Sequence, residues 1–329
     1  MGKLDNLTNM DELRRLLEAQ KSGAARSIND KEMAQKLKER VIGQDHVVDD
    51  LAKLIRLQWA KEKRKRPIAN LLFLGPTGTG KTELAKAMAE YLYGDEKAML
   101  QFACSEFTGP ESKNHLIGVP TGYHGAGQGG KLTRPMLNNP KRLVLFDEVE
   151  KAYQGVFDLF LQMMGDGRLT EPASGDVADF TQSIILLTSN AEENAIVQLQ
   201  KEISDEQELA NAAKSHLVAC GTFRAEMMGR VDKIYIFKQL SEEVRCDIIK
   251  LKMYNLAQSY GLELEYVDAR IVIDALQRSN KLLKYGARAL EQVIDGMLAP
   301  FYVAAREEGA KRVRMEVDAS GDYEVVRSA

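Results

Sequence analysis

Short, continuous apolar runs recur along the first two thirds of the chain and alternate with segments of helical character. The runs lack polar residues at every second position, which is typical of strands covered on both faces of a parallel sheet. We expect such strands at residues 69–74, 98–104, 142–146, 183–187 and 233–237. Their alternation with helices predicts an α/β fold, a three-layer domain with a parallel sheet, over residues 41–238.

The pattern changes after residue 240. Ser241 is followed by two glutamates, which is a helix start signal, and a helix is expected over residues 241–260. A strand at 262–266, two helical segments and two short strands near 313–317 and 323–326 complete the prediction. Residues 239–329 are therefore expected to form a small α+β domain.

Residues 1–40 predict two short polar helices, one within 11–17 and one over 30–40, with Asp30 as the N-cap of the second. Two interpretations remain open for this N-terminal extension. It packs on the predicted α/β domain, which we favour, or it docks a partner.

Composition and charge limit the possible partners and the cellular compartment of the protein. The chain is 44% hydrophobic and has a net charge of −3, which gives no general reason to bind nucleic acid or an anionic membrane. Cys104, Cys220 and Cys246 show neither a disulfide framework nor metal-ligand spacing, so we expect a reducing compartment. No apolar run has the length of a signal segment or a membrane span, and a cytoplasmic protein without membrane contact is predicted.

One segment carries the strongest chemical signal. It fits G-x-x-x-x-G-K-[ST], the phosphate-binding loop of nucleoside triphosphatases, between a predicted strand and a predicted helix. It consists of Gly75, Pro76, Thr77, Gly78, Thr79, Gly80, Lys81 and Thr82. The glycines let successive backbone N–H groups point at phosphate oxygens, and the helix N-terminus adds positive potential. Lys81 is expected to reach the β- and γ-phosphates and Thr82 to ligate Mg²⁺, so ATP and Mg²⁺ are the predicted cofactors.

Two further strand ends carry polar residues. Four apolar residues precede Asp147 and Glu148, so both carboxylates are expected at the edge of the sheet beside the phosphate loop. Asp147 is predicted to hold Mg²⁺, and Glu148 to polarise the water that attacks the γ-phosphate. Asn190 ends another buried strand and is expected between the loop and Glu148, where it would orient that water.

Six motifs together resemble those of Clp-type AAA+ unfoldases, and most closely the second ATPase module of the ClpB members of that family. They are Val41–Gln44, the phosphate loop, and residues 146–148, 166–170, 188–190 and 286–288, in that order. The resemblance covers about residues 40–310. It implies an ATPase whose large domain, residues 41–238, is followed by a lid domain, residues 239–329. It also implies a homo-oligomeric ring, expected to have six subunits, that acts on a protein substrate.

The resemblance also implies residue roles. Val41 and Ile42 would lie against adenine, and Asn190 would sense the γ-phosphate. Arg288 would close the lid over the nucleotide. Arg230 would be the arginine finger given to the ATP of a neighbouring subunit, where it stabilises charge on the transferring phosphoryl group. Arg224 is a second candidate for the finger.

Residues 118–130 are too rich in glycine for a regular element and predict a long loop with one aromatic residue, Tyr123. The matching loop of Clp-type unfoldases lines the central pore, and its aromatic grips an extended polypeptide. His124 departs from the aliphatic residue usual after the tyrosine, and Gly229 from the asparagine usual before the finger. An inert loop is the alternative interpretation.

Three functions stay open. The first, which we favour, is an ATP-driven, ring-forming protein remodeller. The second is an ATP-dependent switch or assembly scaffold with slow hydrolysis. The third is a nucleic-acid motor, supported only by the basic run at residues 61–67, which lacks interleaved aromatics and is better explained as a solvated helix end. No second ATPase module and no loop of the kind that docks the ClpP protease are found.

Overall fold

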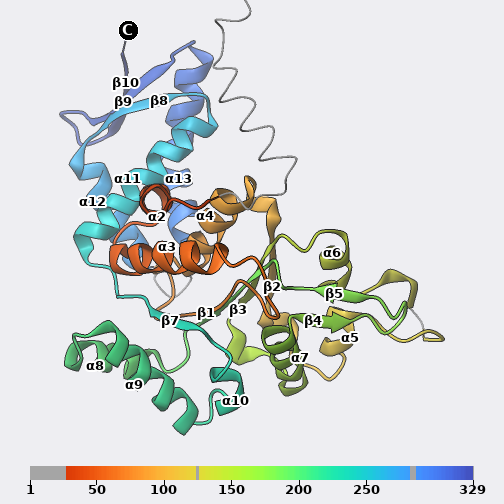
Figure 1. Cartoon of the computed structure of the whole chain (residues 1–329). Coiled ribbons are helices and arrows are strands. Elements are labelled where there is room, and N and C mark those ends of the chain that lie inside the picture. The colour runs from red at the N-terminus through yellow and green to blue at the C-terminus, as the bar shows by residue number, and fades with distance from the viewer. Residues whose placement is uncertain (1–26, 124–125, 282–286, 329) are drawn as a thin grey trace, which may run out of the picture.

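The computed structural model describes residues 27–123, 126–281 and 287–328 (Figure 1). The helix predicted within 11–17, and His124, lie outside the described residues. None of the helices in the described ranges has the length and apolar character needed to cross a membrane.

A five-stranded parallel sheet forms the centre of the larger unit, with strand order β2-β3-β6-β1-β7. Its strands are β1 (Ala69–Leu74), β2 (Met99–Ala103), β3 (Leu143–Asp147), β6 (Ile184–Ser189) and β7 (Lys233–Ile236). All five predicted strands are present, with ends that differ by at most two residues, and the α/β fold class is confirmed.

Both faces of the sheet are covered, which explains its uninterrupted apolar runs. In β1, Leu71 and Phe73 face one hydrophobic cluster, whereas Leu72 and Leu74 face another. The first cluster includes α2 (Asp30–Arg40), α3 (Asp45–Trp59) and α4 (Lys81–Tyr93). Helices on the other side are α5 (Ser112–Ile117), α6 (Thr133–Asn138), α7 (Gln154–Asp166), α8 (Glu193–Glu202), α9 (Glu206–Ala219) and α10 (Ala225–Met228).

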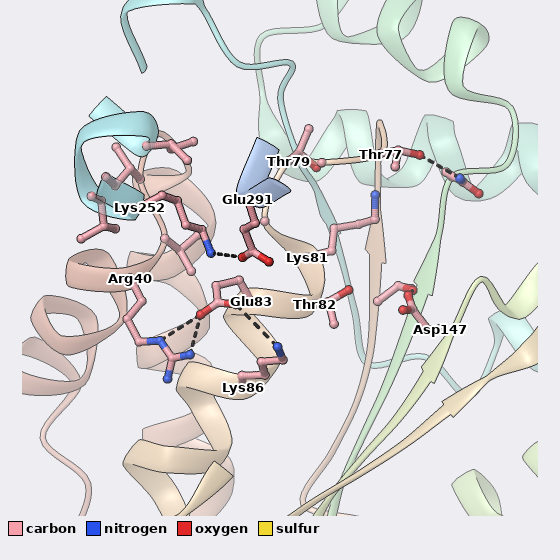
Figure 2. Close-up of a pocket in the computed structure, with 18 of the residues that line it drawn as sticks. Arg40, Thr77, Thr79, Lys81, Thr82, Glu83, Lys86, Asp147, Lys252 and Glu291 are labelled. Atoms are coloured by element: carbon pink, nitrogen blue, oxygen red, sulfur yellow. Dashed lines mark hydrogen bonds and ion pairs between the residues drawn. The ribbon is translucent and has the colours of Figure 1, made fainter. Parts of the chain in front are cut away.

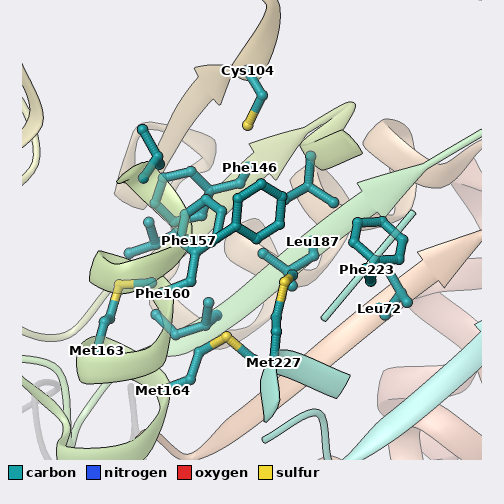
Figure 3. Packing of buried hydrophobic residues seen from close by; sticks show 14 of the residues in the cluster. Leu72, Cys104, Phe146, Phe157, Phe160, Met163, Met164, Leu187, Phe223 and Met227 are labelled. Atoms are coloured by element: carbon teal, nitrogen blue, oxygen red, sulfur yellow. The ribbon is translucent and has the colours of Figure 1, made fainter. Parts of the chain in front are cut away.

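Aromatic packing supports the end of β3 that carries the carboxylates. Phe146 is stacked on Phe102 at 5.3 Å between ring centroids and meets Phe160 of α7 edge-on at 4.6 Å. Figure 3 shows Phe146 and Phe160 together with Phe157 and Phe223 in one cluster. Large rings in such contacts bury much apolar area and restrict movement, so the strand end before Asp147 has a rigid base.

The N-cap of α2 differs from the prediction. Asn29, not Asp30, caps the helix, because its side chain accepts hydrogen bonds from the backbone N–H groups of Lys31 (3.1 Å) and Glu32 (3.3 Å). Asp30 is the first helical residue, where a negative charge favours the helix dipole. Met33 and Leu37 are fully buried against the core, in agreement with an extension that packs on it.

The C-terminal part has its own three-stranded sheet, in the order β10-β9-β8, and its own core. It consists of α11 (Glu242–Ser259), β8 (Glu263–Val267), α12 (Ala269–Lys281), α13 (Ala287–Glu307), β9 (Arg312–Val317) and β10 (Tyr323–Ser328). Ser241 caps α11 as predicted, because its hydroxyl accepts from the N–H of Val244 at 3.3 Å.

One pair of strands was not predicted. β4 (Arg168–Thr170) and β5 (Val177–Asp179) form an antiparallel hairpin beside the loop at residues 118–130. Three-residue strands are too short for the alternation of apolar and polar residues to show. Short 3-10 turns complete the elements at Glu96–Ala98, Cys104–Glu106, Ala126–Gln128 and Val149–Lys151.

Candidate nucleotide-binding site

The phosphate loop connects β1 to α4 in a tight turn. Gly75, Gly78 and Gly80 have φ angles of +142°, +79° and +98°, which side chains with a Cβ rarely adopt. A Cβ on Gly75 would lie 2.6 Å from the carbonyl oxygen of Phe237, so this position also needs glycine for the close approach of the residue that follows β7. Thr79 is buried, and its hydroxyl donates to the Pro76 carbonyl at 2.8 Å, which fastens the loop from inside.

Gln44 joins three segments behind the loop. Its fully buried side chain donates to the carbonyl of Lys238 at 2.9 Å and accepts from the N–H of Lys238 at 3.1 Å. The same amide lies 3.4 Å from the carbonyl of Thr79. The start of α3, the phosphate loop and the connection to α11 are therefore held together by one side chain.

A cavity of about 880 Å³ opens in front of the loop, between the central sheet and the C-terminal part (Figure 2). This volume is within the range of small-molecule sites. The predicted site residues that line it are Val41, Ile42, Thr77, Gly78, Thr79, Gly80, Lys81, Thr82, Asp147, Glu148 and Asn190. Gly75 and Pro76 are not in its lining but present their carbonyls to Lys81.

Lys81 is the charged centre of the loop. Its ammonium donates to the carbonyl oxygens of Gly75 at 2.6 Å and Pro76 at 2.7 Å. Burial lowers the pKa of Lys81 to about 8, although the carboxylates of Asp147 and Glu150 partly oppose the shift. A buried ammonium held only by neutral carbonyls is well suited to receive anionic phosphate oxygens.

Asp147 is held by the neighbouring strand. Thr188 of β6 donates its hydroxyl to Asp147 Oδ1 and accepts the backbone N–H of Glu148 at 3.1 Å. Thr82 and Asp147 lie beside each other in Figure 2, and the Thr82 hydroxyl makes no hydrogen bond among the described residues. A free hydroxyl and a carboxylate are hard oxygen ligands, so these side chains fit Mg²⁺.

Glu148 has a φ of +55°, an uncommon backbone conformation for a residue other than glycine. Its Oε2 forms an ion pair with Lys151 at 2.6 Å. Asn190 donates from Nδ2 to the hydroxyl of Thr77 at 3.1 Å, and its backbone N–H lies 3.4 Å from Glu150 Oε1. Asn190 therefore contacts the phosphate loop, as expected from its place at the end of β6.

Three further predicted residues, Arg230, Arg224 and Tyr123, are not in the cavity lining. The Arg230 guanidinium lies against Gly165 of α7, and Arg224 forms an ion pair with Asp158 at 3.4 Å. Tyr123 is 69% exposed in the loop at residues 118–130. Arg288 belongs to α13, three positions before Glu291, and its side chain lies outside the described part of the structure.

Sequence reasoning missed one wall of the cavity. It is formed by Arg40 of α2, by Ile248, Leu251, Lys252 and Asn255 of α11, and by Glu291 of α13. Lys252 and Glu291 form an ion pair at 2.7 Å that joins the two C-terminal helices at the cavity. The i, i+3, i+7 spacing of Ile248, Leu251 and Asn255 signals a common helix face, but not what that face covers.

A phosphate loop between β1 and α4, with carboxylates at the end of β3, defines a P-loop nucleoside triphosphatase with a parallel sheet. Residues 66–234, about half of the chain, match the family model described as AAA domain (Cdc48 subfamily). The chain belongs to this family and carries a AAA+ ATPase domain, as the motifs predicted.

Similar proteins include three described as chaperone protein ClpB. The protein of Rhodopirellula baltica is 36% identical over 296 residues, which cover 88% of this chain and 33% of that protein. The proteins of Bdellovibrio bacteriovorus and Aquifex aeolicus are each 38% identical, over 264 and 274 residues, covering 80% of this chain and 30% and 26% of theirs. The chain thus spans about a third or less of the length of these curated relatives.

Proposed function

We propose that this chain is the ATP-hydrolysing part of a homo-oligomeric ring, expected to be a hexamer, that remodels polypeptides. The observation that carries the proposal is the convergence of the phosphate loop, Asp147, Glu148 and Asn190 on one cavity. We also propose that residues 41–238 act as the large domain and residues 239–329 as a lid. The cavity between them is where nucleotide binding would change their contact.

Within one subunit, the loop N–H groups and Lys81 bind the phosphates, and Thr82 and Asp147 hold Mg²⁺. Bound Mg²⁺ neutralises charge on the phosphate oxygens. Glu148 accepts the proton of the attacking water, after its carboxylate exchanges the ion pair with Lys151 for that water. Asn190 orients the water from its position beside Thr77. Val41 and Ile42 contact the adenine.

We assign Arg230 to the site of the neighbouring subunit, with Arg288 closing the lid in its own. Support for Arg230 is its absence from the lining of its own cavity. The test mixes Arg230→Ala with Lys81→Ala, two variants that are each expected to be inactive alone. Mixed interfaces combine an intact loop with an intact arginine, so ATP turnover should reappear. Absence of any rescue contradicts the assignment, and rescue by Arg224→Ala in the same mixture would favour Arg224 instead.

The loop that bears Tyr123 is closed at its base. Lys131 and Leu132 donate their N–H groups to the carbonyls of His115 and Leu116, both at 2.9 Å. The buried carboxylate of Glu171, on the β4–β5 hairpin, accepts the N–H of Gly130 at 3.0 Å. An aromatic ring that is exposed on a loop with an anchored base is suited to grip a passing polypeptide regardless of its sequence.

The structure offers little for the nucleic-acid alternative. Two arginines of the basic run have contacts within the protein. Arg64 donates to the carbonyls of Gln58 (3.2 Å) and Trp59 at the end of α3, and Arg66 pairs with Asp232 at 2.8 Å. This agrees with a helix end rather than with a surface prepared for phosphates.

The proposed hydrolysis is tested with Glu148→Gln. This variant keeps every group that binds nucleotide and loses the base, so it should bind ATP, assemble and retain a protein substrate without turnover. Glu202→Gln, an exposed carboxylate at the end of α8, serves as the matched control and should hydrolyse ATP normally. Normal turnover by Glu148→Gln would remove the assigned role.

A further inference from the structure

Helices α8 and α9 form an antiparallel pair (Figure 1). Three side chains that could ligate a metal lie at its open end. The closed end is the short connection at residues 203–205. At the open end lie Glu192, just before α8, and His216 and Cys220, at the end of α9. The ligand atoms of these three described residues, one from each side chain, all lie within 4.8 Å of one another.

We propose that Glu192, His216 and Cys220 form a Zn²⁺ site. Nitrogen, sulfur and carboxylate oxygen are the donors that Zn²⁺ takes in proteins, and three protein ligands with one open position form a recognised type of zinc site. The spacing of the cysteines did not indicate this site in the sequence. Only one of the three ligands is a cysteine, and Glu192 is 24 positions before His216.

Two local features bring the ligands together. His216 and Cys220 are four residues apart at the end of α9, so they share one face of the helix. Glu192 has a φ of +54°, one of two positive values among the described residues other than glycine, and its carboxylate turns back to α9.

The distances fit the ion. Zn–N and Zn–O bonds of about 2.0–2.1 Å place two ligand atoms of a tetrahedral site about 3.3 Å apart. His216 Nε2 and Glu192 Oε2 are 3.4 Å apart. Cys220 Sγ lies within 4.8 Å of both other ligand atoms and contacts the hydroxyl of Thr222 at 3.3 Å. A small rotation of its side chain would bring it to a Zn–S bond of about 2.3 Å. Both other ligands are roughly 40% exposed, which leaves a path for the ion and a position for water.

The three ligands lie close in sequence to two residues of the proposed ATPase machinery. Glu192 follows Asn190 by two residues, and Cys220 precedes Arg224 by four. A bound ion would therefore join the segment after β6 to the segment that leads into α10. The site itself does not depend on the proposed function, because metal binding is measured without ATP.

The experiment titrates the reduced, full chain with Co²⁺, which reports sulfur ligation through a thiolate-to-metal charge-transfer absorption, and then adds Zn²⁺ to displace it. One equivalent should bind and give that absorption. Cys220→Ser should abolish it, and His216→Ala should weaken Zn²⁺ affinity at least about tenfold, since even residues outside the ligand set can cost that much. Zn²⁺ should also raise the Tm of the wild type but not of Cys220→Ser.

Cys246→Ser is the matched control, because Cys246 is a free thiol in α11 outside the group, and it should retain the absorption. The thermal unfolding of each variant without metal checks that it is folded. Absence of the absorption in the wild type, or its persistence in Cys220→Ser, overturns the proposal. His216 and Glu192 would then make only their mutual side-chain contact.

Discussion

The titration of Lys81 predicts a specific pH dependence of ATP binding. Burial lowers the pKa of this ammonium to about 8. The usual pKa of a lysine is 10.5, and each pKa unit corresponds to about 1.36 kcal/mol. The folded protein without nucleotide therefore disfavours the charged form of Lys81 by about 3 kcal/mol. Phosphate oxygens would supply the missing counter-charge, so ATP is expected to return the pKa of Lys81 to its ordinary range or above.

The sign of the effect follows from linkage. Below pH 8 the lysine is protonated with and without ATP, and affinity does not depend on its titration. Above pH 8 the nucleotide-free site loses its proton while the bound site keeps it, so binding requires proton uptake. The Kd should therefore increase about eightfold from pH 7.5 to pH 9.0. By the same reasoning, the stability of the nucleotide-free protein rises between pH 8 and 10.5, where the unfolded chain binds more protons than the folded chain.

The assay is fluorescence titration with a labelled ATP analogue and Mg²⁺ at fixed ionic strength. Lys81→Met should bind weakly and with a Kd that is flat over this range. Lys201→Met, at an exposed position in α8, should retain both the affinity and the pH dependence of the wild type. A flat Kd in the wild type, or an equal slope in Lys81→Met, would refute the assignment of a buried, phosphate-binding lysine.

Substitutions at three further places in the structure have expected outcomes. Gly165→Ala places a Cβ where the Arg230 guanidinium lies, so the rate of ATP turnover should fall. Thermal unfolding should show that the protein is as stable as the wild type, or more stable by about 0.5–1 kcal/mol, because alanine favours the helix more than glycine does. Glu171→Ala leaves buried donors at the base of the Tyr123 loop without their acceptor. Denaturant unfolding should show that the free energy of unfolding falls by about 1–3 kcal/mol. The rate of substrate processing should fall more than the rate of ATP hydrolysis. Asn29→Ala should cost about 1 kcal/mol of stability and Asp30→Ala clearly less, and the reverse order would restore Asp30 as the cap.

The central sheet was predictable because burial on both faces leaves a continuous apolar run, as in β1 and β6. The phosphate loop was predictable because its chemistry requires fixed residue types at fixed spacing within eight positions. The ends of β3 and β6 followed from the geometry of parallel sheets, which places strand ends at one edge.

The remaining parts depend on contacts that local sequence does not encode. The α11 wall of the cavity was missed, because the partner of a helix face is set by tertiary packing. Arg40 was missed because its contacts with Glu83 and Glu90 join positions more than 40 residues apart. The predicted N-cap of α2 was wrong by one residue, because Asn and Asp are both favourable N-caps and only the backbone geometry decides which of the two neighbours caps the helix.

The central claim is that ATP hydrolysis at this site drives work on a polypeptide through the Tyr123 loop. Its most direct test measures ATP turnover and the unfolding of a fluorescent protein substrate in the same sample, for the wild type and Tyr123→Ala. Tyr254→Ala, which removes an exposed tyrosine on α11, is the control and should behave as the wild type. The account predicts that Tyr123→Ala hydrolyses ATP and no longer unfolds the substrate. Unfolding at the wild-type rate by Tyr123→Ala would contradict it.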